Sequence, residues 1–461
     1  MSGLFGALNI ALSSLATSQE ALETSSNNVA NANTPGYSRQ VPDLEAGAPV
    51  LYGSLALGTG VVLDKIESLR DPILEIQLNQ QTQQNSSLNT QLTDLQQIQT
   101  GFSSSTTGIG ADITNFFSSL QQLSPDPTNL SLRQSVLTAA GNLAGDFNTA
   151  ATNLETQRGD LDQSVTQDVS QINTLTSQIA NLNLQISELQ NTGGGTNELV
   201  DQQTNLVRQL STLVDVQAIP SGNGGVTLAT SNGTTLVAGV QSFALSTEAG
   251  SDGTQHVFSG SQDITNTLTG GSLAGTIQIR DQEIPGVLNQ LDQLASGLAN
   301  AVNAANAKGY DLNGKAGGNI FAAPPAGVTG AAANMQVAIT DPSLIAASAD
   351  GTQGSNGNVA NLLAAGTSPV VNGATPIDAY SNLVFQIGNA TSNTSADADA
   401  SGQILQQLQD QRNSVSGVSL NEEAANMVQY QTAYQAASRV VTTISNLLLD
   451  AVNLGEASTE D

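Results

Sequence analysis

The sequence predicts a mainly α-helical protein with an inserted β domain, in which long, coiled-coil-like helices pair the N-terminus with the C-terminus. Three observations support this prediction. Apolar residues recur every seven positions at both ends of the chain. In the middle, the spacing between apolar residues alternates between three and four positions. At 216–280, short runs of Gly, Thr and Val replace this helical spacing. If the two ends pair, the domains between them are nested and discontinuous.

The first helix is expected over residues 4–29. Leu8, Leu15, Leu22 and Val29 follow one another at strict seven-residue spacing, which is typical of a coiled-coil stripe. The asparagines that follow should end this helix, because Asn tolerates the left-handed conformation that terminates helices.

The last helix is expected over residues 420–451. Ser419 and Glu422 have the capping-box spacing that opens a helix. Two heptad positions then carry apolar or aromatic side chains that we expect to pack against the first helix. One position holds Leu420, Met427, Tyr434, Val441 and Leu448, and the other holds Tyr430, Ala437, Ile444 and Ala451.

Between the ends, the apolar spacing predicts helices at 70–100, 111–123, 128–155, 281–306 and 377–415. It also predicts a helical hairpin, in which helices at 161–189 and 199–213 are joined by a turn at Gly193-Gly194-Gly195. We therefore predict three nested domains. Residues 1–60 with 415–461 form an inner terminal coiled-coil domain. Residues 61–215 with 281–414 form a helical domain carrying loops or a small hairpin at 310–376, and residues 216–280 form an outer β domain.

The stretch "NNVANANTPGYSRQ", residues 27–40, is the motif on which we focus. Pro at the second position of a turn and Gly at the third favour a type II turn. Asn side chains can bond backbone groups that such a turn leaves open without adding charge. The residues assigned to an assembly or turn motif are Asn27, Asn28, Asn31, Asn33, Thr34, Pro35, Gly36 and Tyr37. The alternative is a turn that serves only the local fold.

Composition excludes several classes of protein. A net charge of −28, from 11 Lys+Arg against 39 Asp+Glu, leaves no basic footprint for nucleic acid. The absence of cysteine excludes disulfides and thiolate metal sites. The N-terminal segment is amphipathic and has no Lys or Arg before Arg39, so we expect neither a secretory signal, nor a membrane span, nor membrane insertion.

Catalytic chemistry is not predicted either. His256 is the sole histidine, and a lone histidine argues against a triad or a transition-metal site. The run "GYDLNGKA" at 309–316 nearly matches a phosphate-binding loop, but Ala316 replaces the required hydroxyl. Lys315 likewise occupies a ligand position of a calcium loop. We expect an ordinary turn there, and no catalytic, cofactor-binding or metal-binding residues.

We expect the two terminal helices to be unstable in an isolated chain and to be stabilised by neighbouring copies. This indicates a subunit of a filament or tube, because heterologous contacts between identical copies generate helical arrays. Residues 25–40 and 418–441 then resemble the signatures shared by flagellar rod, hook and hook-associated proteins, and "GYDLNG" at 309–314 is similar to a loop of that family. The chain is identified as a member of this family.

The resemblance implies a structural, non-enzymatic subunit of the bacterial flagellum. The expected role is the junction ring that connects the hook to the filament, with the terminal helices lining an axial channel. The implied partners are copies of the chain itself, the hook protein, the next hook-associated protein and an export chaperone at the C-terminal helix. The implied location is extracellular, reached through the flagellar type III export channel without a cleaved signal.

Three other hypotheses remain open from the sequence. They are a hook or rod subunit, a secreted coiled-coil effector or adhesin that binds through residues 216–280, and an enzyme acting on a polymer. The copy number in a ring, the contact residues on each neighbour, the role of the β segment and the reason for the low Lys/Arg content are not determined by the sequence.

Overall fold

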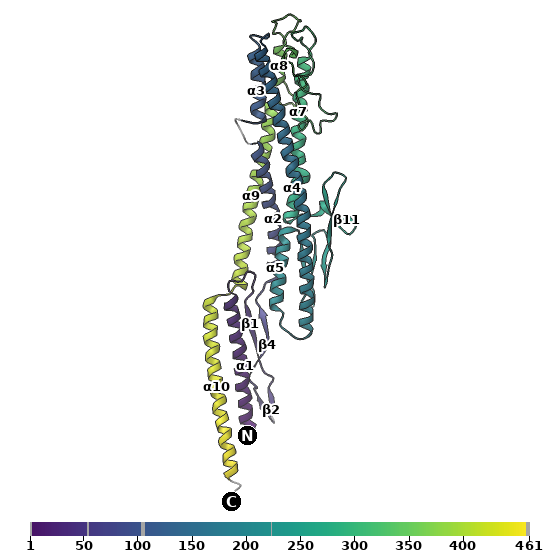
Figure 1. Ribbon diagram of the computed structural model, residues 1–461. Coiled ribbons are helices and arrows are strands. Elements are labelled where there is room, and N and C mark those ends of the chain that lie inside the picture. Colours follow the sequence, from purple (N-terminus) through teal and green to yellow (C-terminus); the bar gives the residue numbers. More distant parts are fainter. Residues whose placement is uncertain (1, 53–54, 103–106, 223, 458–461) are drawn as a thin grey trace. The chain divides into compact units, whose positions relative to one another are not determined.

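A computed structural model describes the chain except residues 1, 53–54, 103–106, 223 and 458–461 (Figure 1). The chain begins with α1 (Ser2–Asn31), followed by four short strands. These are β1 (Gln40–Ala46), β2 (Val50–Tyr52), β3 (Leu55–Leu57) and β4 (Val61–Ser68). β1 pairs with β4 and β2 pairs with β3, both antiparallel, and a register shift between Asp43 and Leu44 marks a bulge in β1.

Four helices follow: α2 (Pro72–Phe102), α3 (Ile109–Leu123), α4 (Leu130–Asn191) and α5 (Asn197–Leu213). α4 is a single helix of 62 residues that joins the stretches expected at 128–155 and 161–189. The polar segment between those stretches contains one glycine, Gly159, and no proline, and a single glycine costs only about 1 kcal/mol in a helix. The chain turns between α4 and α5 at Gly193, whose φ is +77°.

The β region consists of two small antiparallel sheets. The first contains β5 (Gln217–Pro220), β6 (Val226–Ala229), β7 (Thr235–Ala238) and β8 (Gln241–Ser242) in sequence order. The second contains β9 (Leu245–Ala249), β10 (Gln255–Ser259) and β11 (Gln262–Asp263).

Strand structure ends at Asp263, earlier than the expected residue 280. A 3-10 turn, η1 (Thr265–Thr267), and the helix α6 (Gly271–Gln278) follow. Residues 275–280, which we predicted within the β domain, are therefore helical. Short apolar runs are ambiguous between strand and helix, and here Leu273 and Ile277, four residues apart, are both buried on one face of α6.

The remaining elements are η2 (Ile279–Glu283), a π-helical turn, and α7 (Ile284–Asn306), then loops with one 3-10 turn, η3 (Pro342–Leu344). The helices α8 (Val359–Thr367), α9 (Pro376–Ser416) and α10 (Leu420–Ala457) complete the chain. Within the loops, isolated bridges join Tyr310 to Ala316 and Phe321 to Val337.

The chain divides into two compact units, each assembled from discontinuous segments. The first unit contains Met1–Thr82, Ile172–Ala244 and Gln403–Asp461, and the second contains Gln83–Gln171 and Leu245–Gly402. This nesting agrees with the expected discontinuous organisation. The three-domain boundaries proposed from the sequence stay a prediction.

The second unit has a continuous apolar core supplied by α2, α3, α4, α7, α8, α9 and the loops. Phe116, Leu120, Phe147 and Phe321 are fully buried there, and the rings of Phe116 and Phe321 lie 5.7 Å apart. Arg133 is 1% exposed; its guanidinium donates to the carbonyls of Pro127, Pro342, Ser343 and Ile345. It thereby holds the loop around η3 against the start of α4.

In the first unit, α1 and α10 lie side by side, with the start of α1 and the end of α10 at the same end of the pair (Figure 1). The predicted pairing of the N- and C-terminal helices is therefore confirmed. α1 also contacts β1 and β4, so the β hairpin covers part of the pair.

Candidate assembly site at the turn after the first helix

The turn that follows α1 has the predicted geometry. α1 ends at Asn31, and the Tyr37 N–H donates to the Thr34 carbonyl at 3.2 Å. Gly36, the third residue of this turn, has a φ of +80°. An i to i+3 hydrogen bond with a positive φ at the third position defines a type II turn.

Asn28 is the centre of this motif and is 1% exposed. Its Nδ2 donates to the Gln40 carbonyl at 2.8 Å, and its Oδ1 accepts from the Gln40 N–H at 2.9 Å. The Tyr37 hydroxyl donates to the same Oδ1 at 2.9 Å. One neutral side chain therefore satisfies both backbone groups where β1 begins and the phenol of the turn, at no cost in buried charge.

The other predicted motif residues lie at the edge of the turn. The Asn31 amide donates to Asn27 Oδ1 at 2.7 Å, and the Thr34 hydroxyl donates to Asn31 Oδ1 at 3.1 Å. Asn33, Thr34 and Pro35 are exposed. Arg412 Nη2 donates to the Gly36 carbonyl at 3.0 Å, which ties the turn to the end of α9.

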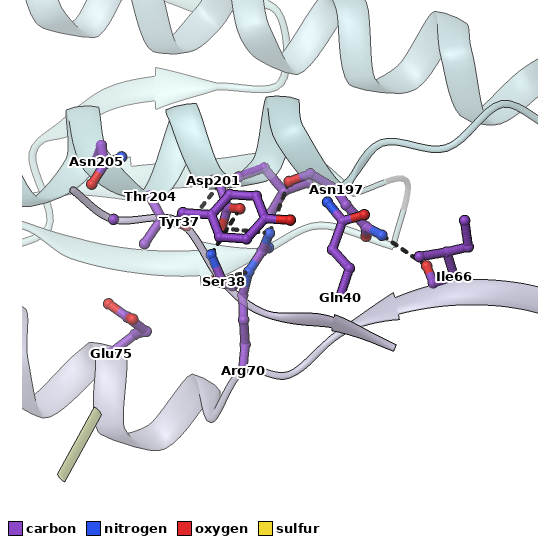
Figure 2. Close-up of polar contacts among 12 residues, drawn as sticks. Tyr37, Ser38, Gln40, Ile66, Arg70, Glu75, Asn197, Asp201, Thr204 and Asn205 are labelled. Atoms are coloured by element: carbon purple, nitrogen blue, oxygen red, sulfur yellow. Dashed lines mark hydrogen bonds and ion pairs between the residues drawn. The ribbon is translucent and has the colours of Figure 1, made fainter. Parts of the chain in front are cut away.

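Two charged residues that sequence reasoning did not single out hold the residue after the turn (Figure 2). The Ser38 N–H donates to Asp201 Oδ2 at 3.1 Å. Arg70 lies between the two segments: its Nη2 is 2.8 Å from Asp201 Oδ1, and its Nε donates to Ser38 Oγ at 3.2 Å. The Arg70 Nη2 also donates to the Asn197 carbonyl, where α5 begins.

Glu75 forms a second junction one turn into α2. Its two carboxylate oxygens accept from Arg412 Nε at 2.9 Å and from Arg208 Nη2 at 2.8 Å. A half-buried carboxylate held by two guanidinium groups joins α2, α5 and α9 at one point. Such charge-assisted hydrogen bonds are about twice as strong as neutral ones.

A third junction joins the turn to the start of α10. Arg39 Nε lies 2.7 Å from Glu423 Oε1, and Arg39 Nη1 lies 2.7 Å from Glu422 Oε2. Glu423 is 1% exposed, so this cation compensates a buried carboxylate that would otherwise be costly. The Arg39 N–H also donates to the Ser416 carbonyl at 2.9 Å.

We call this set the turn clamp: Asn28, Tyr37, Ser38, Arg39, Arg70, Glu75, Asp201, Arg208, Arg412 and Glu423. All of it lies in the first unit. It binds the turn to α2, α5, α9 and α10, and so fixes where the terminal helices leave the rest of this unit.

The clamp perturbs the titration of Tyr37. Burial, together with the negative charges of Asp201, Glu198 and Glu423, raises the pKa of Tyr37 to about 12. The neutral phenol is the form that donates to Asn28, so the hydrogen bond from Tyr37 to Asn28 is not lost by ionisation of the phenol at physiological pH.

The charged members of the clamp could have been found only in part from the sequence. With 11 Lys+Arg in 461 residues, each cation among so many acids is a candidate for pairing, and Arg39 lies directly after the turn. Glu422 and Glu423 lie in the first turn of α10, and the predicted capping residue Ser419 accepts from the Glu422 N–H through its Oγ at 3.5 Å. Nothing in the sequence indicates that Arg39 is their partner.

The heptad residues that were predicted to pack between the terminal helices are not the most buried residues of those helices. Leu8, Leu15 and Leu22 are half-buried, and Val29 is 38% exposed. The buried side of α1 instead consists of small or polar residues, namely Ala11, Thr17, Ser18, Ala21, Thr24, Ser25 and Asn28. Small side chains allow the close approach of α10 and the β hairpin.

On α10, Glu423, Ala437 and Ile444 are buried. Met427, Tyr430, Val441 and Leu448 are half-buried, whereas Leu420 and Tyr434 are 55% and 36% exposed. Val428, Val440, Leu447 and Leu449 are exposed as well. Large apolar side chains thus remain uncovered on both helices of the pair.

Within the described ranges, no group of three or more His, Asp or Glu side chains is arranged to hold a metal ion. The same part of the chain contains no helix with the length and apolar character of a membrane span.

Comparison with known proteins identifies the family. Residues 95–321 match the family described as the flagellar hook-associated protein FlgK helical domain. Residues 8–37 match the flagella basal body rod protein family, and residues 409–454 match the C-terminal family of flagellar basal body rod FlgEFG proteins. The two rod matches cover the paired helices, including the start of the turn clamp.

Full-length relatives agree with these matches. Flagellar hook-associated protein 1 of Bacillus subtilis (strain 168) is 30% identical, over 98% of this chain and 99% of that protein. The protein of the same name from Escherichia coli (strain K12) is 28% identical, over 96% and 98%. The solved structure of the flagellar hook junction protein FlgK from Burkholderia pseudomallei has a TM-score of 0.67 and 22% identity, and covers 74% of this chain and 100% of that chain.

The family matches and the full-length relatives define this protein, with its paired terminal helices, as a subunit of the bacterial flagellum. The chain belongs to the flagellar hook-associated protein 1 family, and it acts as a structural protein at the junction of hook and filament. Self-assembly and contact with hook components follow from this membership.

Proposed function

We propose that copies of this chain form a closed ring around an axial channel, with the hook protein on one side and the next hook-associated protein on the other. The observation that carries the proposal is the distribution of side chains around α10. One face of that helix packs on α1, and the remaining faces are uncovered in the single chain.

These uncovered faces differ in chemistry. Ala433, Val440 and Leu447 follow at seven-residue spacing on one flank of α10, and Leu420 and Leu449 lie on the opposite flank. Between the flanks, the side that faces away from α1 is mainly polar and carries Asn421, Gln435, Arg439, Thr443, Asn446 and Asp450, all exposed. Apolar flanks that cover each other between neighbours, and a polar side left to line a channel, fit a heterologous ring.

The turn clamp has a defined part in this assembly. It sets the direction in which α1 and α10 leave the rest of the first unit, and a ring closes only when every copy presents its flanks at the same angle. We propose that the motif residues at 27–37 act in assembly through this positioning.

We also propose that the protein has no catalytic activity. Tyr37 and Arg70 of the first unit have shifted pKa values, and both side chains bond to neighbouring protein groups. They therefore act as structural contacts.

We also propose that the chain leaves the cell through the flagellar type III export channel without loss of a signal segment. Membership in the flagellar hook-associated protein 1 family supports this route. Mass spectrometry of protein recovered from purified flagella tests it: the intact chain has a mass of 47.0 kDa. A shortened N-terminus, or unchanged secretion in a strain without the export apparatus, would contradict it.

An export chaperone is proposed to bind α10 before assembly, because that helix carries uncovered apolar flanks. A photo-crosslinking residue at Val440 should form an adduct with a small cytosolic protein in cells whose export is blocked. The same photo-crosslinking residue at Arg439, on the polar side, should form at least several-fold less of this adduct. Equal adducts at both positions, or none, would overturn the proposal.

Electron microscopy of cells that lack this gene tests the junction function. Complete hooks without filaments, with flagellin lost to the medium, are expected. Missing hooks would assign the subunit to the rod or hook. Normal motile flagella in a strain without a second copy would contradict a flagellar role.

A further inference from the structure

The four-stranded sheet of the first unit ends in β5 on one side and in β8 on the other. Among the described strands, each of these two has a single neighbour, and every pair in the sheet is antiparallel. Apolar side chains are exposed at both edges: Ile219 of β5 is 56% exposed, and Val240 and Phe243, on either side of β8, are 54% and 43% exposed. Four strands are too few to close into a barrel, so the two edges of one sheet cannot pair with each other.

Charge does not protect these edges. Natural proteins usually keep foreign strands away from a sheet edge with charged side chains, lysine above all. Residues 216–247 contain no charged side chain, although the whole chain has a net charge of −28. Copies of so acidic a chain repel one another, so an uncharged edge is a place where two copies can approach closely.

The hydrogen bonds within the sheet determine which backbone groups of β5 face outwards. The Ser221 N–H donates to the Gly225 carbonyl at 2.7 Å, and residues of an antiparallel strand bond to the same neighbour at every second position. The backbone groups of Ala218 and Pro220 therefore point to the outer edge. Proline has no N–H, so within β5 only Ala218 offers both a donor and an acceptor there.

The same reasoning applies to β8 at the opposite edge. The Phe243 N–H donates to the Leu236 carbonyl at 2.8 Å, so residues 241 and 243 bond towards β7. Ser242 lies between them and points its N–H and carbonyl outwards. Each edge strand thus has one residue that can exchange two hydrogen bonds with a new strand.

We propose that β8 of one copy adds to β5 of a neighbouring copy as an antiparallel strand, with Ser242 opposite Ala218. Because the sheet has an even number of strands, the added copy continues the antiparallel alternation. Two different edges of the same chain make a heterologous contact, which can propagate around a ring and use both edges of every copy. The inference rests on the proposed ring and assigns it a contact outside the terminal helix pair.

This register also brings exposed apolar side chains together. Phe243 of one copy lies opposite Gln217 of the next and diagonal to Ile219, a separation that aromatic side chains can bridge. Val240 comes next to Pro220, which lines a pocket of about 230 Å³ between the sheet, α2 and α5. The pocket walls near Pro220 include the apolar residues Ile76, Val200, Val207 and Ala218.

The natural chain contains no cysteine, so introduced cysteines can be crosslinked without background. Ile219→Cys and Gln241→Cys are placed in one chain, which is expressed in a strain without the native gene, and isolated flagella are oxidised mildly. In the proposed register these residues are a non-hydrogen-bonded pair between copies, with Cα atoms about 4.5 Å apart, which suits a disulfide. The expected result is a ladder of covalent multimers.

Two controls test the direction and the register of the contact. Within one chain, β5 and β8 are three strand spacings apart, about 14 Å, so the two cysteines cannot join internally. Each single-cysteine variant should give at least tenfold less multimer, because a heterologous contact brings unlike residues together. Gln217→Cys with Gln241→Cys places the cysteines diagonally, about 7–8 Å apart, and should give several-fold less.

A substitution at the edge supplies a second measurement. Ser242→Pro, in the double-cysteine chain, removes the outward N–H and no hydrogen bond within the sheet, which is the position where a strand accepts proline. It should reduce the multimers at least tenfold. Ser242→Ala keeps the N–H and should leave them unchanged. Circular dichroism spectra should be the same for both variants.

The two hypotheses fail in different ways. If the double-cysteine chain is present in the flagella without a ladder, or if Ser242→Pro leaves the ladder unchanged, the strand pairing is overturned and the ring is not. Dimers from a single-cysteine variant, or adducts with a different protein in place of the ladder, would also overturn it. If the native chain is absent from isolated flagella, the proposed function itself is wrong.

Discussion

The core of the second unit and the terminal helix pair of the first unit are both helical, but they are packed in different ways. In the second unit, large side chains such as Phe116, Leu143 and Phe147 are fully buried. In the terminal pair, the buried side of α1 is small and polar, while Phe5 and Leu12 are 53% and 46% exposed. The second unit therefore has a complete core within one chain, whereas the terminal pair keeps large apolar side chains exposed.

The largest effect is expected from a substitution in the core of the second unit. Phe116→Ala removes the ring that contacts Phe117 and Phe321, and should lower the free energy of unfolding of the second unit by about 3–5 kcal/mol. Leu12→Ala should change it by less than about 0.5 kcal/mol, yet reduce motility if copies cover that residue. Urea unfolding followed by hydrogen exchange measures both, and similar losses for the two variants would contradict the distinction.

The turn clamp, which positions the terminal pair, gives the next largest expected effect. Gly36→Val forces a β-branched residue to a φ of +80°, and its Cβ would overlap the Asn205 side chain. Backbone strain of this kind costs about 1–3 kcal/mol. We expect faster hydrogen exchange in residues 28–40 and loss of motility.

Gly141→Val is the matched control for Gly36→Val. A Cβ at Gly141 meets no atom within 4 Å, and this glycine lies inside α4, so the control should remain motile. Unchanged motility of the Gly36→Val strain would count against a role of the turn in assembly.

A smaller effect is expected from the alkaline titration of the clamp. The pKa of Tyr37 is raised to about 12, so the stabilisation by its neutral hydroxyl is complete below about pH 10, the ordinary pKa of tyrosine. It should be lost as the pH rises through 12. Ultraviolet titration of the phenols should show a late transition that Tyr37→Phe reduces but does not abolish, because burial also raises the pKa of Tyr380. A late transition that is unchanged in the Tyr37→Phe variant would contradict the burial argument.

The smallest effect belongs to the sole histidine of the second unit. The hydrogen bond to Asp263 at 2.7 Å raises the pKa of His256, and Asp252, 3.3 Å from Nε2, adds to the rise. Burial of Asp263 acts to raise its pKa. Hydrogen bonds from His256 and Thr265 outweigh burial and lower the pKa of Asp263 to about 2.

The stabilisation by charged His256 should be complete below about pH 6.5 and should disappear as the pH rises through the elevated pKa of the folded state. Nuclear magnetic resonance can follow this single imidazole. Asp263→Asn should lower its pKa towards 6.5, and an unchanged titration in that variant would show that the pairing is absent in solution.

Local chemistry made several features predictable. Pro35 and Gly36 favour a type II turn, Ser419 and Glu422 mark the start of a helix, and the asparagines favour the end of α1. Seven-residue apolar spacing predicted both terminal helices and their pairing. Each of these signals acts within a few residues, so one sequence is sufficient to read it.

Contacts between distant segments were not predictable in the same way. Arg39 meets Glu423, and Glu75 meets Arg412, across separations of 384 and 337 residues. Many other acids could have paired with these cations, and only the fold selects among them.

By itself, the sequence determined the helical class, the turn, the end of α1, the start of α10 and the flagellar resemblance, because these depend on spacing and backbone preference. Tertiary structure alone decided which face of each helix is covered. The heptad leucines Leu8, Leu15 and Leu22 are only half-buried, while Ala21 and Asn28 lie inside. The physical reason is that burial depends on which neighbour is present: small residues lie where α10 and the hairpin approach closely, and larger ones remain available to other copies.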